Sequence, residues 1–215
     1  MRSPFVLPES VRSFSQYAEF NVSTETVIAI LGYSFGSDLL FLPKVSPSHI
    51  PADNKSYIRR RLEDALRKVA FNSEMARREF LMAPIILEVA TLAEAALASE
   101  HPFDISPRLH GSLDYLLQKE NAVVVIEAKS ADMSRGFTQL SAEMIALDQY
   151  VDPIVPMIYG AVTTGDTWRF GTLDRENKRI TQDIHQFTIP DDLDDLLAVL
   201  VGILEGAPAE GAVAG

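Results

Sequence analysis

Three charged side chains interrupt two apolar runs near the middle of this 215-residue sequence. Asp114 lies in the first run, and Glu127 and Lys129 lie in the second. Charged groups are costly to bury without partners, so side chains in such positions need a partner or a function. Two carboxylates are suitable ligands for a hard divalent cation, and the carbonyl oxygen of Ala128 could be a third. A lysine beside that cation could orient or deprotonate an attacking water, or neutralise charge that develops during the reaction.

The two runs, 111–117 and 122–129, predict a β-hairpin. Apolar, β-branched and aromatic residues flank a short polar break, as in two strands joined by a tight turn. We expect the turn to be centred on Lys119 and Glu120.

Alternation along the strands would bring the three charged groups together. Glu127 and Lys129 are two residues apart and should point to the same face of the sheet. The expected turn places Asp114 opposite Val125 and Ile126, close enough to Glu127 for both carboxylates to share one cation. A salt bridge of Lys129 with Glu127 or Asp114 at a sheet edge is the alternative interpretation.

This pattern resembles the PD-(D/E)XK nuclease-like superfamily. Asp114 is followed by Glu127-Ala128-Lys129 after a Val-Val-Val-Ile strand, although Leu113 stands where the motif has proline. The resemblance implies a restriction-endonuclease-like fold and Mg²⁺ as cofactor, with Mn²⁺ as a substitute. It implies Asp114, Glu127 and the Ala128 carbonyl as metal ligands, and Lys129 as a catalytic residue.

A glutamine downstream extends the resemblance. The segment 136–144 begins a helix, and Gln139 follows the lysine by about ten residues. Superfamily members with a Gln-x-x-x-Tyr signature carry this glutamine beside the metal site, whereas Glu143 stands here at the tyrosine position. Gln139 would then assist catalysis; otherwise it is a polar residue on a solvated helix face.

A segment upstream resembles the first core helix of type I restriction nuclease subunits and related predicted bacterial endonucleases. This helix begins near Ser73, a plausible N-cap. The resemblance implies an acidic residue near the metal or its waters. Glu74 is our candidate for this catalytic role, and Glu79 and Glu88 are competitors. With a strand-turn-strand at 159–170, the resemblance spans about 74–173.

The charge distribution restricts how nucleic acid could bind. The net charge is −11 and the pI is about 4.8, so indiscriminate binding to phosphate is not expected. Residues 55–78 nevertheless hold eight basic and three acidic side chains. Within this patch we assign Arg77 and Arg78 to nucleic-acid contacts. A solvated helix with internal ion pairs is the alternative.

Composition excludes several classes of site and location. There is no cysteine, and the four histidines lack ligand spacing, so neither thiolate nor zinc chemistry is expected. The longest apolar stretch, 196–204, is too short to span a bilayer. The first residues lack the pattern of a secretory signal. A soluble cytoplasmic protein without membrane association follows.

The order of elements predicts an α/β protein with a mixed central sheet flanked by helices. Helix, three strands, helix and strand should follow one another along the chain. We divide the chain into an N-terminal accessory segment packed on the core (1–54), a nuclease-like domain (55–204) and a flexible tail (205–215).

The sequence pattern predicts the following helices and strands. Long helices are expected over 55–69, 74–99 (kinked or divided at Pro84), 134–150 and 191–204. A short helix is expected over 9–17. Strands are expected over 26–31 (with a helix as the alternative), 35–42, 102–109, 154–162, 168–173 and 179–184. Met75, Met82, Ile85, Ile86 and Val89 should face the core.

The expected function is metal-dependent hydrolysis of phosphodiester bonds, with DNA as the substrate. The alternative is a catalytically inactive nuclease-fold module that binds or regulates. A homodimer and an additional partner subunit both remain open.

Overall fold

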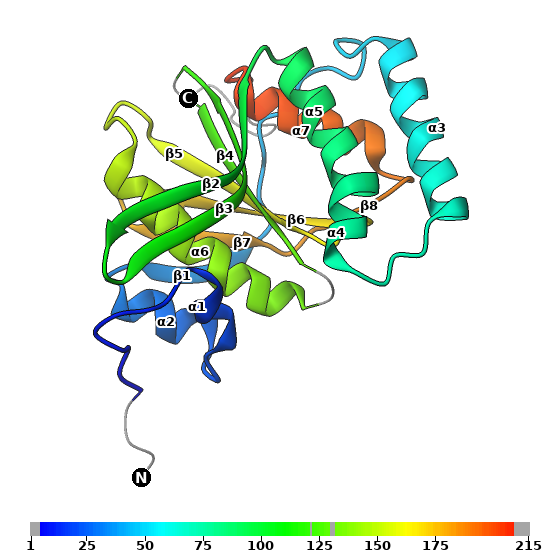
Figure 1. The fold of residues 1–215 in the computed structure, drawn as a ribbon. Helices are drawn as coiled ribbons and strands as arrows, with labels where there is room; N and C mark the ends of the chain where they lie inside the picture. Colours follow the sequence, from blue (N-terminus) through cyan, green and yellow to red (C-terminus); the bar gives the residue numbers. More distant parts are fainter. Residues whose placement is uncertain (1–4, 121, 130–131, 209–215) are drawn as a thin grey trace.

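A mixed β-sheet forms the centre of the molecule, with helices packed on both of its faces (Figure 1). The computed structural model describes residues 5–120, 122–129 and 132–208. Within these residues eight strands form one sheet in the order β1-β7-β6-β5-β4-β3-β2, and β8 pairs with β6. The strands are β1 (Ser34–Asp38), β2 (Ala96–Ser106), β3 (Leu109–Lys119), β4 (Ala122–Ala128), β5 (Met157–Thr163), β6 (Thr167–Asp174), β7 (Arg179–Asp183) and β8 (Phe187–Thr188).

The helices form two layers. They are α1 (Ser15–Glu19), α2 (Thr24–Ile30), α3 (Ala52–Lys68), α4 (Glu74–Arg77), the π-helix η1 (Arg78–Met82), α5 (Ala83–Leu92), α6 (Met133–Tyr150) and α7 (Leu193–Leu204). Helices α3, η1, α5 and α7 cover one face of the sheet, and α1, α2 and α6 cover the other (Figure 1).

The central strand β4 is buried on both faces. Val124, Ile126 and Ala128 belong to the apolar cluster on the α5–α7 side, and Val123 and Val125 to the cluster on the α6 side. A strand covered by helices on both sides reads as a continuous apolar run, which is the observed sequence pattern. Alternation then directs every second residue of β4 towards α6.

The core order of elements is confirmed. Helix α5, strands β2, β3 and β4, helix α6 and strand β5 follow one another as predicted. Strands β3 and β4 pair as an antiparallel hairpin, and Trp168 is fully buried in the core. The structure is therefore a mixed α/β protein with helices flanking the sheet.

The predicted helix 74–99 and strand 102–109 are wrong at their boundaries. The helical segment changes from π to α geometry at Ala83, next to Pro84, and ends at Leu92. The chain enters the sheet at Ala96, because the small and polar residues from there pair along β3. Met75, predicted to face the core, is 69% exposed. Met82 and the three following core residues are buried as expected.

The N-terminal segment forms more helix and less strand than predicted. Residues 26–31, preferred as a strand, lie largely in α2, which begins at the N-cap Ser23. The predicted helix 9–17 is confined to α1, and the strand 35–42 to the shorter β1. β1 pairs in parallel with β7 at the edge of the sheet, and α1 and α2 pack against α6. The segment thus contributes to the central sheet itself. Most of the predicted tail, from 209 on, lies outside the described residues.

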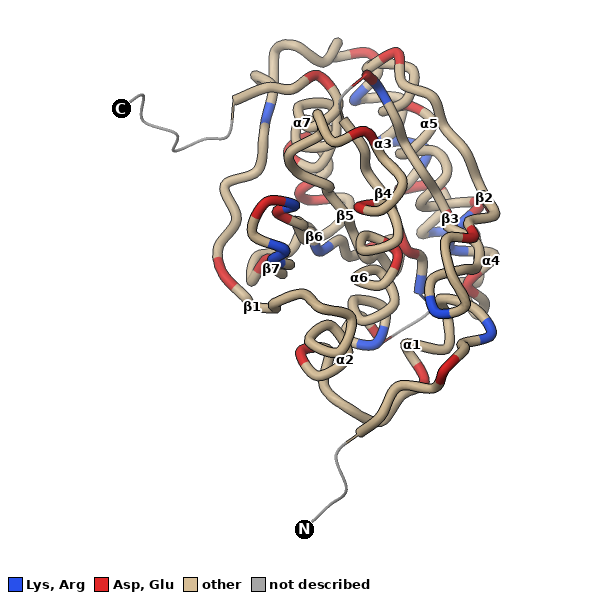
Figure 2. The backbone as a smooth tube through the Cα atoms, turned by 90° about the vertical axis from the view of Figure 1, so that its left-hand side faces the viewer, with Lys and Arg blue, Asp and Glu red and all other residues tan. Residues whose placement is uncertain are grey.

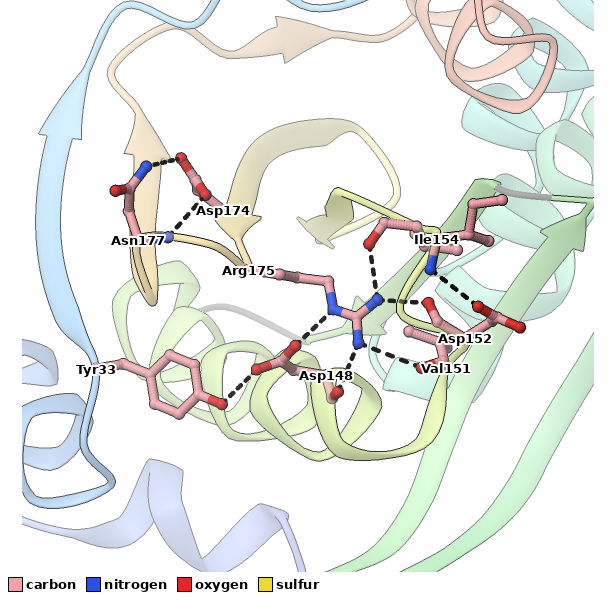
Figure 3. A network of polar contacts seen from close by, with 9 residues as sticks. Tyr33, Asp148, Val151, Asp152, Ile154, Asp174, Arg175 and Asn177 are labelled. Atoms are coloured by element: carbon pink, nitrogen blue, oxygen red, sulfur yellow. Dashed lines mark hydrogen bonds and ion pairs between the residues drawn. The ribbon is translucent and has the colours of Figure 1, made fainter.

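The C-terminal end of α6 is fixed by Arg175 (Figure 3). Its Nε lies 2.5 Å from Oδ1 of Asp148, and its Nη atoms donate to the backbone oxygens of Asp148, Val151, Asp152 and Val155 at 2.6–3.2 Å. The last carbonyl groups of a helix have no partner within the helix, so the guanidinium satisfies them. Tyr33 donates to the other Asp148 oxygen at 2.5 Å, which connects the helix to the start of β1.

No helix of the described part of the chain is both long enough and apolar enough to cross a membrane.

Candidate functional site

The hairpin register brings Asp114 opposite Glu127. The last paired residues before the strands separate are Tyr115 and Ile126. One step further along both strands lie Asp114 and Glu127, which therefore share a face of the sheet. This is closer than expected, because Lys119 still pairs with Ala122, one residue beyond the predicted end of the pairing. Position 121 itself lies outside the described residues.

The row of carboxylates continues onto β2. Ser99 and His101 pair with Tyr115 and Leu113, so Glu100 between them stands opposite Asp114. Glu100 has a positive φ of 51°, an uncommon conformation for a non-glycine residue. Its side chain is exposed and accepts from Arg78.

Asp114 is held at the point where the hairpin ladder ends. Its Oδ2 accepts the backbone N–H of Ala128 at 2.8 Å, and its Oδ1 lies 3.4 Å from Nη1 of Arg78. The guanidinium of Arg78 also lies over the ring of Tyr115, 5.1 Å from its centroid. The side chain of Asp114 is 16% exposed, so solvent reaches this carboxylate.

Lys129 is held between two oxygens on the α6 side of β4. Its Nζ lies 2.5 Å from Oε1 of Glu127 and donates to Oε1 of Gln139 at 3.0 Å. Its backbone N–H donates to the Thr163 carbonyl, so the strand geometry extends to this residue. The predicted same-face arrangement of Glu127 and Lys129 is thereby confirmed. The ion pair with Glu127 is also confirmed, but it lies on a central strand rather than at a sheet edge.

The polar chain continues along α6. Gln139 Nε2 donates to Oε1 of Glu143 at 2.9 Å. Gln139 is 5% exposed and Glu143 is fully buried, because both lie between α6 and the sheet. The interpretation of Gln139 as a residue on a solvated face is therefore wrong. The i, i+4 spacing on a helix places both side chains on the face that meets β4.

Burial and mutual repulsion change the protonation of the two buried glutamates. Burial, then Glu143, then Asp114 raise the pKa of Glu127 well above its usual value, against the opposing effect of Lys129. Burial raises the pKa of Glu143 to about 7, with the hydrogen bond from Gln139 acting the other way. Such a pair titrates as a unit, and a proton on Glu143 leaves the negative charge next to Lys129.

Lys129 remains a cation in this environment. Burial alone would lower its pKa, but the charges of Glu127, Glu74 and Asp114 outweigh this effect and raise it. The site therefore holds a charged ammonium among acidic groups. The side chain of Lys129 is 20% exposed to solvent.

A glycine permits the close approach of α6 to the lysine. A Cβ at Gly136 would lie 2.8 Å from Cγ of Lys129 and 2.8 Å from Cγ1 of Val162. Real Cβ atoms do not approach other heavy atoms so closely, so the aliphatic part of Lys129 requires glycine at this position.

An open cleft of about 480 Å³ adjoins the carboxylate row. Glu74, our preferred helix glutamate, lines it together with Arg78 and Glu100, and its charge acts on Lys129. Glu79 lines this cleft and a second one between α3 and α5. Glu88 lines only the second cleft and accepts from Asn54 at 2.5 Å. The structure thus brings Glu74 to the site and leaves Glu88 away from it.

The two arginines assigned to nucleic-acid contacts differ in position. Arg78 belongs to the carboxylate cluster. Arg77 turns away, donates to the Thr164 carbonyl at 3.0 Å and lies 3.5 Å from Oδ1 of Asp166. On α3, Arg67 pairs with Glu63 and Asp64 within the helix, as the alternative interpretation expected. Basic and acidic residues are interleaved along the chain in Figure 2 rather than separated onto single elements.

Of the predicted metal ligands, the structure brings the carboxylates of Asp114 and Glu127 onto one face of the hairpin. Within the described ranges no three Asp, Glu or His side chains form a metal-binding group, so side chains alone do not complete a ligand set. Oε2 of Glu127 and Oε2 of Glu143 are both buried and accept no hydrogen bond from the described residues. An oxygen left in this way is a suitable ligand, and Asp114 stands opposite Glu127.

Two residues of this cluster were missed as site residues. Glu143 was noted only as the residue at the tyrosine position, although its spacing from Gln139 and from the inward-facing Leu140 and Leu147 could have indicated burial. Glu100 was given no role, because it fell between the helix expected to end at 99 and the strand expected to begin at 102.

No protein-family model matches this chain, and no curated protein matches it at a significant level.

Proposed function

We propose that this protein is a divalent-metal-dependent nuclease that hydrolyses phosphodiester bonds of DNA. The observation that carries the proposal is the position of Lys129. Its ammonium group lies between Glu127 and Gln139 on a central strand, beside Asp114 on the neighbouring strand. A structural ion pair needs one acid, whereas this lysine contacts Glu127 and Gln139 and also feels the charges of Glu74 and Asp114.

Asp114, Glu127 and the Ala128 carbonyl would hold Mg²⁺, for which Mn²⁺ would substitute. When bound, the cation acts as a Lewis acid on the phosphate and lowers the pKa of its water. The other steps depend on side chains of the protein. Lys129 orients the attacking water and neutralises negative charge at the phosphate, and Gln139 keeps the ammonium in place.

The order α5-β2-β3-β4-α6-β5 supports a restriction-endonuclease-like fold as part of the proposal. Glu74, on the wall of the cleft, supports the outer shell of the cation. Arg78 is suited to contact a DNA phosphate, because a guanidinium binds phosphate oxygens through two parallel hydrogen bonds.

A second candidate function is a binding module that keeps this fold without catalysis. It is favoured by Arg78 and Lys129, which already neutralise the two carboxylates that would hold the metal. The net charge of −11 also favours it over a protein that binds DNA strongly.

Cleavage of plasmid, linear and single-stranded DNA with Mg²⁺ or Mn²⁺ distinguishes the two functions. Wild type, Lys129→Ala and Glu127→Gln should be compared with Lys119→Ala, which changes a lysine at the other end of the same hairpin. Circular dichroism checks that each variant is folded.

Cleavage by wild type and Lys119→Ala alone is the expected result. Retained metal-dependent cleavage in both site variants would disprove the assignment. Lack of cleavage in all four proteins, together with no Mn²⁺ binding, would favour the binding module.

A further inference from the structure

Glu143 ends a chain of hydrogen bonds that begins at Lys129. Lys129 Nζ donates to Gln139 Oε1 at 3.0 Å, and Gln139 Nε2 donates to Glu143 Oε1 at 2.9 Å. All three side chains lie where β4 meets α6, and Glu143 is fully buried.

The two ends of the Gln139 amide are not interchangeable here. An ammonium group only donates hydrogen bonds, so it requires the oxygen end of the amide. A turned amide would bring its N–H groups against the ammonium and its oxygen against the carboxylate of Glu143. Both contacts would be repulsive in a buried place, where unmade hydrogen bonds are costly. The acceptor at Glu143 therefore selects the orientation that Lys129 needs.

We propose that Glu143 is a positioning residue, which fixes the amide of Gln139 so that its oxygen holds Lys129 in the site. The catalytic consequence rests on the nuclease function proposed above. Glu143 acts on Lys129 through Gln139, because its own carboxylate is fully buried where β4 meets α6 and bonds the Gln139 amide.

The neighbours of Glu143 explain which substitutions should preserve this role. Its second oxygen, Oε2, is buried without a hydrogen-bond partner among the described residues, and its charge acts on Glu127. Glutamine at 143 keeps an oxygen for Gln139 and offers an N–H group to Glu127. Methionine keeps the length but removes the acceptor. Aspartate keeps the carboxylate but withdraws it by one methylene.

The experiment compares Glu143→Gln, Glu143→Met and Glu143→Asp by two measurements. The first is kcat and KM for DNA cleavage with Mn²⁺. The second is the ¹⁵N signal of the Lys129 ammonium in protein without DNA or metal, assigned by its loss in Lys129→Arg. Methionine and aspartate should lower kcat at least about tenfold with little change in KM, and should shift or broaden the signal. Glutamine should retain both within about threefold.

A double variant tests whether Glu143 acts through Gln139. In a Gln139→Met background, adding Glu143→Met should lower kcat no further, since the intermediate group is already absent. An additional loss equal to that of the single variant would overturn the proposal. If Glu143→Met does not fold, Glu143→Asp decides in its place.

The ammonium signal separates this proposal from the proposed function. If wild type neither cleaves DNA nor binds Mn²⁺, the nuclease assignment fails, but the signal still reports the contact of Lys129 with Gln139. An unchanged signal in folded Glu143→Met or Glu143→Asp would overturn the positioning role whatever the activity.

Discussion

The carboxylate of Asp114 and the backbone N–H of Ala128 are joined across the hairpin by a hydrogen bond of 2.8 Å. The bond forms where the ladder between β3 and β4 ends, so a side chain replaces the next backbone acceptor. Asp114 therefore has two separable properties: an acceptor that holds the strand ends together, and a negative charge directed at the site.

Substitution of Asp114 should separate these two properties. Asparagine keeps an acceptor for Ala128, so the melting temperature should stay within about 2 °C of wild type, while Mn²⁺ affinity falls at least about tenfold. Alanine also leaves a buried N–H unpaired, which costs about 1–3 kcal/mol of stability. Mn²⁺ titration and thermal melts measure the two effects. Glu88→Gln is the control, since Glu88 pairs with Asn54 away from the site. Equal Mn²⁺ affinity in wild type and Asp114→Asn would contradict a metal site here.

Arg78 should compete with a cation for Asp114. Nη1 of Arg78 lies 3.4 Å from Oδ1 of Asp114, and the side chain of Arg78 is 20% exposed to solvent. Removing this charge by Arg78→Met should strengthen Mn²⁺ binding by about fivefold, or about 1 kcal/mol. It should weaken DNA binding if the guanidinium contacts phosphate. Arg77→Met is the matched control, because Arg77 contacts Thr164 and Asp166 instead. Weaker Mn²⁺ binding in Arg78→Met would contradict the competition.

Gly136→Ala should impair the site while favouring the helix. Alanine is the better helix former by about 1 kcal/mol. Its Cβ would nevertheless lie 2.8 Å from Cγ of Lys129, so the lysine must shift from Glu127 and Gln139. We expect a folded protein whose cleavage rate falls about tenfold. Ser134→Ala, an exposed change in the first turn of α6, should leave the rate unchanged. Full activity in Gly136→Ala would show that the lysine position tolerates this displacement.

The central hairpin and α6 could be predicted because their local patterns agree with their environment. The strand 122–128 is apolar except at Glu127 and is buried on both faces, and the two-residue alternation correctly placed Glu127 and Lys129 together. The end of the pairing was misplaced by one residue, which understated how directly Asp114 faces Glu127.

The remaining errors arise where local pattern and tertiary packing disagree. Residues 26–31 are apolar and β-branched, but they form a helix because α6 offers a surface for Val27 and Ile28. The burial of Glu143 depends on the packing of α6 against the sheet, which the local pattern of α6 does not contain. The pairing of Arg78 with Asp114 likewise depends on the docking of η1 beside β3. Short-range spacing contains none of this information.

Arg175 should be important for stability without touching the site. It neutralises Asp148 and satisfies four backbone oxygens at the end of α6, and both side chains are nearly buried. Removing one partner of such a pair costs about 3–5 kcal/mol, so Arg175→Met should unfold at clearly lower urea concentration. Arg67→Met is the control, because its exposed pairs on α3 contribute only about 0.5 kcal/mol. A midpoint close to wild type in Arg175→Met would contradict this role.

The buried Glu143 should make stability fall as pH rises. Its pKa is about 7 in the folded protein, against an ordinary value of 4.5. Between these two values the folded state keeps a proton that the unfolded chain releases, so the free energy of unfolding decreases with increasing pH. The contribution is fully present below the lower value and is lost as pH passes the higher one.

Glu143→Gln removes this titration and keeps the hydrogen-bonding groups. Urea unfolding in EDTA at pH 5 and pH 8 should therefore show a stability difference that shifts in favour of the variant at the higher pH. Glu88→Gln changes a half-buried carboxylate and is the control. Its stability difference from wild type should be the same at both pH values. The difference in unfolding free energy between wild type and Glu143→Gln could instead stay constant over this range. That result would mean that Glu143 is ionised throughout and that Lys129 compensates two buried charges at once.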